Sequence, residues 1–476
     1  MPYLSTNLQT NSKPVRSLIS AAIFFVLASS ESSAAQSPNF ILILTDDHGW
    51  TSTSTPMDAK EPLSQSDYHE TPNLDRLARS GMRFSQGYSP GAICTPTRRS
   101  VLFGQTPIRM GEDDGFDQRY DPYEKGYLTI PNLLKSIDPN YRAAHLGKWH
   151  IKSGEFYPEE FGFDESDGST SNEDGSIWEH KEDKWKKTFL VDSPKRVDHI
   201  SERGANFIRR NAAAGHPFYL QLSYYATHVD IQTKPETYAK FSKKKRGVAH
   251  DHPGYAGMLH DLDTGIGRVL DQVEQAGISD RTYIIMMADN GGVEFIPPSG
   301  NKLAHPDAHN RKQRNYPLRG GKWVLYEGGI RVPFLIAGPG IVANSQSDVP
   351  VAGYDLLPTL GDLAGHQGSL PDYLDGGSLK PLLLNHGKGE VTRADEGLYF
   401  HRYATSYPHT AIRLGDFKLI KFWSDYYDTK KRVELYNLSK DLGETNDLAS
   451  KMPQLSQELE NRLLEYLEKV GADFSK

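Results

Sequence analysis

The sequence is poor in three features that each define a class of protein: cysteine, excess positive charge and long apolar runs. One cysteine in 476 residues closes no disulfide within the chain and builds no zinc site from thiolates. The 54 lysines and arginines are outnumbered by 61 aspartates and glutamates, and a net charge of −7 argues against a nucleic-acid-binding protein. With 24% charged and 37% hydrophobic residues, the composition is that of an ordinary globular protein, not a disordered or collagen-like one.

The longest apolar run, Leu18–Ala28, is too short to span a bilayer. It follows a polar segment that carries Lys13 and Arg16, and small residues up to Ala35 come after it. This order is typical of a secretory signal peptide. We therefore expect residues 1–35 to be removed and the protein to be exported, to the periplasm or outside the cell, with no stable membrane anchor. A buried N-terminal helix is the alternative.

The rest of the chain first alternates apolar strands with amphipathic helices. The strand candidates are Asn39–Leu44, Tyr141–Leu146, Phe218–Tyr224, Tyr283–Ala288 and Val332–Ala337. The helix candidates are Thr71–Ser80, Thr129–Ile137, Val197–Ala214 and Gly254–Ala276. Apolar strands that alternate with helices predict an α/β domain, with a doubly wound, mostly parallel sheet flanked by helices.

The pattern changes after about residue 390. Short alternating stretches separated by turn residues then predict an antiparallel sheet: Gly397–Tyr403, Thr410–Leu414, Phe417–Trp423 and Val433–Asn437. An amphipathic helix, Pro453–Val470, follows them. We therefore divide the chain into a signal peptide (1–35), a main α/β domain that carries the catalytic residues (36–390) and a smaller C-terminal α+β domain (391–476).

Polar residues stand directly after four of the predicted strands. Ligands of doubly wound sheets bind at the carboxyl ends of the strands, so these positions predict the active site. They are Asp46 and Asp47, Lys148 and His150, His228, and Asp289 and Asn290. The three aspartates and the asparagine offer hard oxygen donors, which suit Ca²⁺ or Mg²⁺ better than zinc or copper. Clustered carboxylates also repel one another unless a cation lies among them. The alternative is that these side chains cap helices.

The single cysteine has a distinctive setting. Cys94, Pro96 and Arg98 have the spacing Cys-x-Pro-x-Arg. On this motif the sequence resembles the formylglycine-dependent (type I) sulfatases of the alkaline-phosphatase superfamily. The family's Gly-Lys-x-His signature and its C-terminal segments are also matched, at Gly147–His150, Gly320–Pro333, Ile412–Ile420 and Glu434–Leu438. Phe103, Asn140 and Thr227 depart from the family pattern. The resemblance nonetheless spans nearly the whole mature chain.

The resemblance implies a reaction and its cofactors. A formylglycine-generating maturation enzyme would oxidise Cys94 to formylglycine (3-oxoalanine), which also joins the four oxygen donors as a metal ligand. One hydroxyl of the aldehyde hydrate would attack the sulfur of a sulfate ester. Deprotonation of the second hydroxyl would then expel sulfate and regenerate the aldehyde.

The resemblance also implies a role for each cationic side chain. Arg98 would hold the hydrate, and Lys148 would contact both the hydrate and the sulfate. His150 would assist the release of sulfate, and His228 would protonate the leaving alcohol. Lys322 would bind a sulfate oxygen. The alternative for these cations is a solvated surface position.

The segment Asn301–Lys322 is basic within an acidic protein. It has six cations (Lys302, Arg311, Lys312, Arg314, Arg319 and Lys322) against Asp307 alone. A cationic rim attracts a polyanion, so we hypothesise a sulfated polysaccharide or oligosaccharide as substrate, contacted by Arg311 and Arg314. His401 and Arg402 are further candidate contacts. Aromatic residues suited to stacking on sugars are Tyr157, Trp178 and Trp185. A solvated basic loop is the alternative.

Two other functions stay open. A phosphonate monoester or phosphodiester hydrolase would share the fold and the nucleophile. A chain in which Cys94 stays a thiol would be a binding protein for sulfated glycans. Export and the basic segment favour a sulfate ester over the first of these, and the complete set of catalytic residue types argues against the second. The sugar, the sulfated position and the oligomeric state do not follow from the sequence.

Overall fold

The computed structural model describes residues 9, 11, 36–110, 126–152, 154–177, 187–293, 315–403, 408–423 and 433–472. The predicted signal peptide therefore lies almost entirely outside the described residues. The chain from Ser37 on forms one compact unit. No helix in these described ranges is long and apolar enough to cross a membrane.

An eight-stranded sheet forms the centre of this unit. Its order is β11 (Ser345–Ser347), β2 (Met82–Phe84), β10 (Phe334–Ala337), β9 (Thr282–Ala288), β1 (Asn39–Thr45), β7 (Phe218–Ser223), β4 (Arg142–Gly147) and β5 (Glu165–Ser166). From β9 to β5 every pair is parallel, whereas β10 runs antiparallel to both of its neighbours. The predicted doubly wound, mostly parallel sheet is confirmed.

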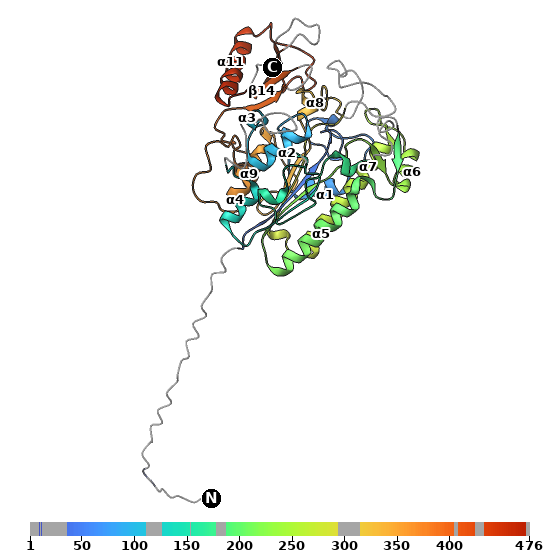
Figure 1. Cartoon of the computed structure of the whole chain (residues 1–476), viewed down its shortest axis with the longest axis vertical. Helices are drawn as coiled ribbons and strands as arrows, with labels where there is room; N and C mark the ends of the chain where they lie inside the picture. Colours follow the sequence, from blue (N-terminus) through green and yellow to red (C-terminus); the bar gives the residue numbers. More distant parts are fainter. Residues whose placement is uncertain are drawn as a thin grey trace, which may run out of the picture. The chain divides into compact units, whose positions relative to one another are not determined.

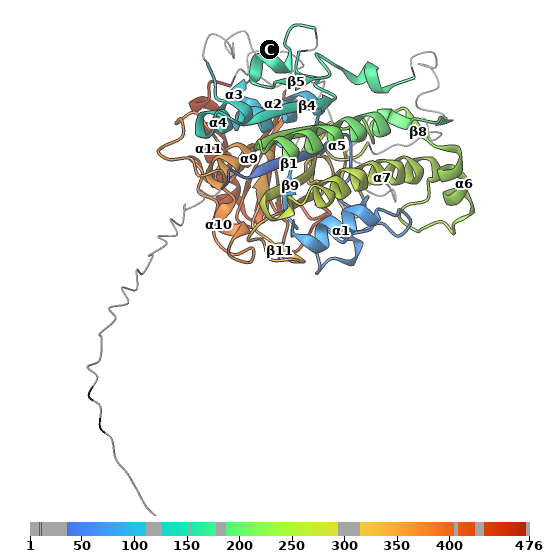
Figure 2. The ribbon, with the colours of Figure 1, turned by 90° about the horizontal axis from the view of Figure 1, so that it is seen from below.

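Helices cover both faces of the sheet (Figures 1 and 2). One face carries α1 (Pro72–Ser80), α5 (Val197–Ala214) and α7 (Pro253–Gln275), and the other carries α2 (Cys94–Phe103), α4 (Ile130–Ile137) and α9 (Leu356–Leu363). In β1, Ile41 and Ile43 pack toward the first set, and Phe40, Leu42 and Leu44 pack toward the second. Burial on both faces explains the unbroken apolar run of this strand.

The antiparallel sheet predicted near the C-terminus is also present. It is formed by β13 (Leu398–Arg402), β14 (His409–Leu414), β15 (Phe417–Phe422) and β16 (Val433–Asn437), paired in that order. One face packs on α11 (Pro453–Lys469), and the other packs on residues 324–330. The domain boundary at residue 390 stays a prediction. The remaining named helices and strands are β3 (Gly87–Tyr88), α3 (Pro107–Met110), β6 (Thr188–Leu190), β8 (Ile231–Thr233), α6 (Pro235–Lys243), α8 (Glu327–Ile330), β12 (Val351–Ala352) and α10 (Lys380–Leu383).

A buried ion cluster joins the small sheet to α8. Lys418 of β15 lies 3.0 Å from Glu327 Oε1, in α8, and 2.8 Å from Glu444 Oε1. All three residues are at most 1% exposed. Tyr88 also donates a hydrogen bond to Glu327, at 2.9 Å. Because α8 begins five residues after Lys322, this cluster fixes the small sheet against the segment that carries that lysine.

Substitution of Lys418 by methionine is expected to destabilise the fold, because it removes the cation paired with buried Glu444 and leaves Glu327 with one ion pair among the described residues, to Arg331 at 3.3 Å. The free energy of unfolding, measured in urea, should fall by about 3–5 kcal/mol. Lys421→Met is the matched control, since Lys421 lies on the same strand and its ion pair with Glu460 is more exposed. That loss should be about 1 kcal/mol or less. Equal losses for the two variants would show that the buried cluster does not stabilise this junction.

Candidate active site

The polar residues predicted at the strand ends lie together at one edge of the sheet. Strands β9, β1, β7 and β4 are consecutive neighbours and parallel, so their carboxyl ends meet. Backbone hydrogen bonds continue past the strands into the site: Asp46 N to Ala226 O and Asp289 N to Thr45 O, each 2.9 Å, and Lys148 N to Ser223 O, 2.8 Å. These bonds hold the three turns in register.

Four of the predicted ligands form one buried cluster. One ligand atom each from Asp46, Asp47, Cys94 and Asp289 lies within 4.8 Å of the others, and all four residues are buried. Asp46, Cys94 and His228 form a second such group. Neighbouring side chains of a strand normally point to opposite faces. Asp47 has a φ of 51°, in the left-handed region, and this local conformation lets its carboxylate join that of Asp46.

The asparagine completes a donor set that fits a hard cation. Asn290 Nδ2 donates to Asp47 Oδ1 at 2.7 Å and to Gly291 O at 2.9 Å. Its Oδ1 is buried and has no hydrogen-bond partner among the described residues. A buried amide oxygen without a partner is costly, and it is the kind of ligand that Ca²⁺ and Mg²⁺ accept. Three carboxylates and this oxygen therefore fit such an ion.

Cys94 lies at the centre of the cluster, as the first residue of α2. Its Sγ is 3.3 Å from Asp46 Oδ1, and Lys322 Nζ is 3.5 Å away. Burial, together with the charges of Asp289 and Asp46, raises the pKa of the Cys94 thiol well above its ordinary value. Without a cation in the cluster, these surroundings favour the neutral thiol over the thiolate that cysteine hydrolases use.

Three buried cations face the three carboxylates. Arg98, one turn after Cys94, donates to Asp289 Oδ2 at 2.7 and 3.1 Å and to Lys148 O at 2.7 Å. Lys148 pairs with Asp46, and Lys322 Nζ lies 2.8 Å from Asp47 Oδ1. Burial opposes the ionisation of Asp46, but nearby positive charges, of which Lys148 is the strongest, outweigh it and hold its pKa well below the ordinary value. Burial and the charge of Asp46 raise the pKa of Asp289 to about 6.

Two histidines border the cluster. His228 Nε2 lies 3.9 Å from Asp47 Oδ2, while its Nδ1 lies 2.5 Å from Val229 O. Because a carbonyl oxygen only accepts, Nδ1 carries a proton and Nε2 faces the cluster. His150 Nδ1 lies 3.4 Å from Thr95 Oγ1. Burial lowers the pKa of both rings well below the ordinary value, with Lys322 as the next cause for His228 and Lys148 for His150.

The structure thus brings together the ten predicted metal and catalytic residues, whose individual roles stay predictions. The predicted basic rim is different. Arg311, Arg314, Trp178 and Trp185 lie outside the described residues. Arg319 does not belong to a rim, because its guanidinium donates to Tyr436 OH at 2.9 Å and Glu444 O at 3.1 Å. Its Nη1 also lies 3.8 Å from Glu434 Oε2, and this opposite charge holds Arg319 at the junction with the small sheet.

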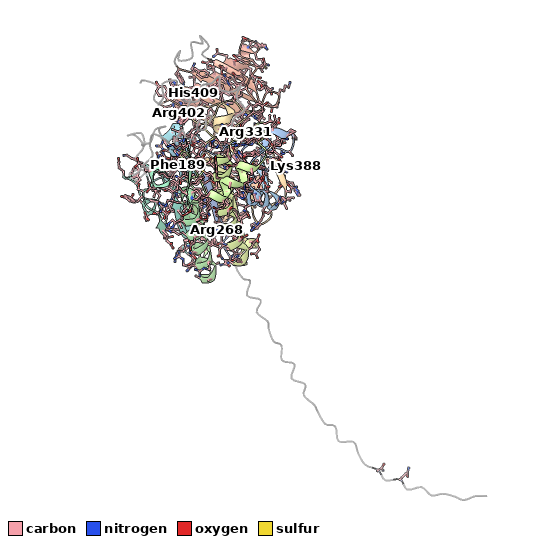
Figure 3. All side chains as sticks on the ribbon, turned by 90° about the vertical axis from the view of Figure 1, so that its right-hand side faces the viewer. Phe189, Arg268, Arg331, Lys388, Arg402 and His409 are labelled. Atoms are coloured by element: carbon pink, nitrogen blue, oxygen red, sulfur yellow. The ribbon has the colours of Figure 1, made fainter. Side chains whose placement is uncertain are left out.

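The two candidate contacts from the small sheet are buried. His401 Nδ1 lies 2.8 Å from Thr410 Oγ1, and burial lowers the pKa of His401 to about 3. Arg402 pairs in the ladder with His409, and the two lie side by side in Figure 3. His409 Nε2 accepts a hydrogen bond from Leu325 N at 3.0 Å. The end of β13 therefore lies near the Lys322 segment, and contact of His401 and Arg402 with substrate stays a prediction.

Sequence reasoning missed residues that shape the site without carrying its chemistry. Thr227 Oγ1 donates to the carbonyl oxygens of Asp46 and Asp47, at 3.2 and 2.9 Å, and so fixes the turn that bears both carboxylates. Trp323 is half-buried beside Lys322, whose Nζ lies 5.5 Å from the centre of the indole ring. Adjacency to Lys322 was the one available signal for Trp323, and Thr227 was visible only as a departure from the family pattern.

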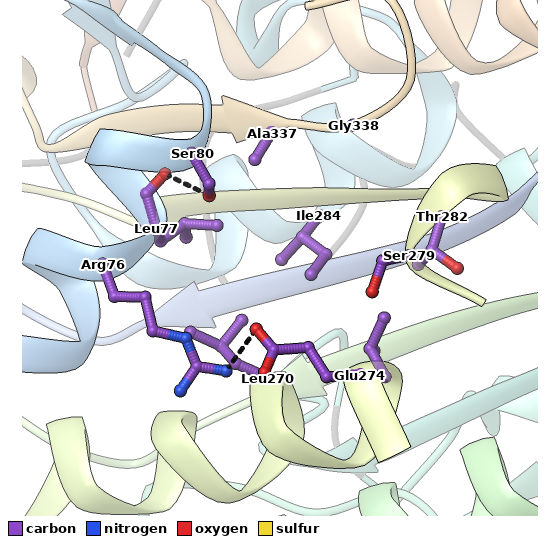
Figure 4. Close-up of a pocket in the computed structure, with 11 residues that line it drawn as sticks. Arg76, Leu77, Ser80, Leu270, Glu274, Ser279, Thr282, Ile284, Ala337 and Gly338 are labelled. Atoms are coloured by element: carbon purple, nitrogen blue, oxygen red, sulfur yellow. Dashed lines mark hydrogen bonds and ion pairs between the residues drawn. The ribbon is translucent and has the colours of Figure 1, made fainter. Parts of the chain in front are cut away.

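A separate pocket lies at the opposite end of the sheet. It measures about 200 Å³ and opens beside Thr282 and Ile284 at the start of β9 (Figure 4). Arg76 and Glu274 pair at its mouth, with 3.0 Å between Nη2 and Oε1. It has no cluster of carboxylates, histidines or cysteine, so the candidate active site is the one at the carboxyl ends.

A doubly wound sheet with carboxylates and cations paired at its carboxyl ends is suited to a hydrolase of anionic esters. Comparison with known proteins identifies the family. The family model "Sulfatase" matches residues 38–366, and the model "N-sulphoglucosamine sulphohydrolase, C-terminal" matches residues 321–470. Because the first match covers more than half of the chain, this protein belongs to the sulfatase family. It is a sulfatase, an enzyme that hydrolyses sulfate esters, as the Cys-x-Pro-x-Arg resemblance predicted.

Relatives and solved structures agree. A sulfatase of Formosa agariphila is 28% identical, over 94% of this chain and 92% of its own length. The N-acetylgalactosamine-6-sulfatase of Canis lupus familiaris is 29% identical, over 82% of this chain and 73% of its own. The crystal structure of Ps i-CgsB in complex with k-i-k-neocarrahexaose superposes with a TM-score of 0.72 at 27% identity, covering 91% of this chain and 93% of that one.

Proposed function

We propose that this sulfatase removes sulfate from an exported-compartment carbohydrate, a sulfated polysaccharide or oligosaccharide, with formylglycine at position 94 as the nucleophile. One observation carries the proposal: the single cysteine of the chain lies buried among three carboxylates and three cations. Burial and the neighbouring carboxylates favour the neutral Cys94 thiol, which is a poor nucleophile, and this supports the modification of the residue.

Asp46, Asp47, Asp289 and Asn290, with residue 94, would hold a divalent cation, Ca²⁺ or Mg²⁺. Bound there, the ion would lower the pKa of a coordinated hydroxyl and polarise the sulfate oxygens. The hydrated aldehyde, formed by a separate maturation enzyme, would supply one hydroxyl to attack sulfur and a second for release of sulfate. A serine or cysteine at this position lacks that second hydroxyl.

The chain's own cations leave the site positively charged for an anionic substrate. The three buried carboxylates are balanced by Arg98, Lys148 and Lys322, so a divalent cation would give the site a formal charge of +2, which attracts the monoanionic sulfate ester and equals the charge of the dianionic sulfate that is released. Lys148 pairs with Asp46 and Lys322 with Asp47, and both would bind sulfate oxygens as charge develops. Arg98 holds Asp289 and the Lys148 turn in place.

His228 is placed to act on the leaving group. The neutral ring carries its single proton on Nδ1, bound to Val229 O, so Nε2 must first gain a proton, which the negative charge of a bound sulfate ester favours. As the sulfur–oxygen bond breaks, its electron pair moves to the sugar oxygen, and that oxygen takes the Nε2 proton. His150, two residues after Lys148, would accept the proton whose loss from the second hydroxyl expels sulfate.

Names of relatives support a sulfated sugar as the substrate. One relative is an N-acetylgalactosamine-6-sulfatase, and Ps i-CgsB was solved with a neocarrahexaose. The predicted signal peptide supports export, and the basic segment Asn301–Lys322 supports a polyanionic chain. A phosphonate or phosphodiester hydrolase is the competing function, because it needs the same fold and nucleophile.

Sulfate release from a panel of substrates tests the proposal. N-acetylgalactosamine 6-sulfate, carrageenan oligosaccharides, 4-nitrophenyl sulfate and phenyl phosphonate esters would be compared by kcat/KM. We expect a sulfated sugar to exceed the phosphonate esters by about 10-fold or more. A preference for phosphonate esters would instead identify the competing hydrolase. Tight glycan binding without sulfate release would identify the binding protein.

A further inference from the structure

The buried ion pair between Lys195 and Asp230 lies beside the active site and has no role in the chemistry described so far. Lys195 Nζ is 2.7 Å from Asp230 Oδ1, and both side chains are 1% exposed. Asp230 also accepts hydrogen bonds from Gln232 Nε2 at 3.1 Å and from Ile177 N at 3.2 Å. Three donors therefore fix its carboxylate: Lys195 Nζ, Gln232 Nε2 and Ile177 N.

Burial of the Lys195–Asp230 ion pair makes an unfavourable contribution to the free energy of folding. Burying two charges costs several kcal/mol per ion, which their attraction offsets only with good geometry and further hydrogen bonds. Lys195 also has a φ of 51°, and the next residue, Arg196, has a φ of 54°. Non-glycine residues in the left-handed region are strained, and such strain concentrates at functional sites. Strain and buried charge therefore coincide at one turn.

The pair connects directly to His228. Asp230 follows Val229, and the carbonyl that accepts the His228 Nδ1 proton belongs to the peptide bond between Val229 and Asp230. Fixing Asp230 therefore fixes the direction of this carbonyl, which in turn sets the tilt of the His228 ring and points Nε2 into the cluster. Lys195 N also donates to Gln232 Oε1 at 3.0 Å, so two contacts join the turn before α5 to β8.

We propose that the Lys195–Asp230 ion pair is a positioning element that orients His228 for proton donation to the leaving sugar oxygen. This inference rests on the proposed function, in which His228 is the acid. A sugar alkoxide is a strong base and leaves only as it gains a proton. The anion of an acidic phenol, 4-nitrophenolate, leaves without one. Loss of His228 positioning should therefore lower kcat for a sugar sulfate and leave kcat for 4-nitrophenyl sulfate unchanged, whereas general damage to the site lowers both.

The test compares kcat for N-acetylgalactosamine 6-sulfate with kcat for 4-nitrophenyl sulfate. Lys195→Met and Asp230→Asn each leave one buried charge unpaired. The test therefore depends on the double variant K195M/D230N, which removes both charges. We expect its kcat on the sugar sulfate to fall by about 100-fold, the lower range for loss of a general acid. Its KM on the sugar and its kcat on the aryl sulfate should change by less than about 3-fold, within the effect of an ordinary surface substitution.

A second ion pair between the same two segments provides the matched control. Lys234 Nζ lies 2.8 Å from Asp198 Oδ2, but these side chains are 22% and 28% exposed and do not contact the peptide that holds His228. Lys234→Met should leave kcat on both substrates unchanged. His228→Ala gives the reference pattern for loss of the acid.

The outcomes separate this inference from the proposed function. A selective loss on the sugar sulfate in both His228→Ala and K195M/D230N supports the positioning role. A selective loss in His228→Ala alone, or an equal loss on both substrates in a folded K195M/D230N, overturns it and leaves the proposed function intact. Equal losses in His228→Ala, or no sulfate release by the unsubstituted enzyme, overturn the proposed role of His228, and the inference falls with it. Thermal melting of each variant confirms that it is folded.

Discussion

Replacement of Cys94 by serine is expected to stop the enzyme after one turnover. A serine hydroxyl at this position, 3.3–4.0 Å from Asp46 and Asp47 if it follows the thiol, can still attack sulfur. It carries no second hydroxyl on the same carbon, so the sulfate ester on the protein cannot collapse to an aldehyde. Steady-state kcat should fall by about 10⁴-fold or more, as for other removals of a nucleophile.

Rapid-mixing kinetics and intact mass measure this result. Cys94→Ser should release one equivalent of alcohol per protein and gain the mass of one sulfo group. Cys94→Ala, which has no nucleophilic atom, is the control and should show neither the burst nor the added mass. Sustained turnover by Cys94→Ser at close to the unsubstituted rate would contradict a geminal diol as the nucleophile.

Removal of the metal should have an effect of similar size. Chelation should abolish sulfate release, and Ca²⁺ or Mg²⁺ should restore it. The three carboxylates and Asn290 Oδ1 form the donor set for such an ion, and activity requires the ion to be bound there. Asp289→Asn keeps the shape of the side chain and removes one charge from the donor set. We expect it to weaken Ca²⁺ binding, measured by calorimetry, and to lower kcat by about 10²–10³-fold.

A buried carboxylate outside the site is the control for Asp289→Asn. Asp263 of α7 is buried and accepts hydrogen bonds from Asn73 N at 3.1 Å and Leu74 N at 2.8 Å, at the start of α1. Asp263→Asn should lower the melting temperature without changing Ca²⁺ affinity. Unchanged Ca²⁺ affinity in Asp289→Asn, or full activity in chelator, would show that this cluster is not the metal site.

The site could be predicted from the sequence because its residues stand at the ends of strands that are easy to recognise. Apolar runs such as Asn39–Leu44 mark strands buried on both faces, and parallel strands bring their carboxyl ends to one edge. The direction of β10 was not predictable in this way. An apolar strand of four residues has the same pattern whether it runs parallel or antiparallel to its neighbours.

Buried charges were the main failure of sequence reasoning. Arg319 was assigned to a solvent-facing rim, but its partners Tyr436 and Glu444 lie more than 100 residues away along the chain. Lys195 was not singled out, because it sits in an ordinary polar stretch and its partner Asp230 is 35 residues distant. Burial of a charge depends on such long-range partners, and left-handed φ angles at lysine and arginine leave no mark in the sequence.

The mass of the tryptic peptide Phe84–Arg98, taken from active enzyme made in its native cell, tests the central claim most directly. This peptide contains residue 94 and no internal lysine or arginine. The account predicts an aldehyde, or its hydrate, in place of the thiol. An intact thiol in protein that turns over sulfate esters would contradict it.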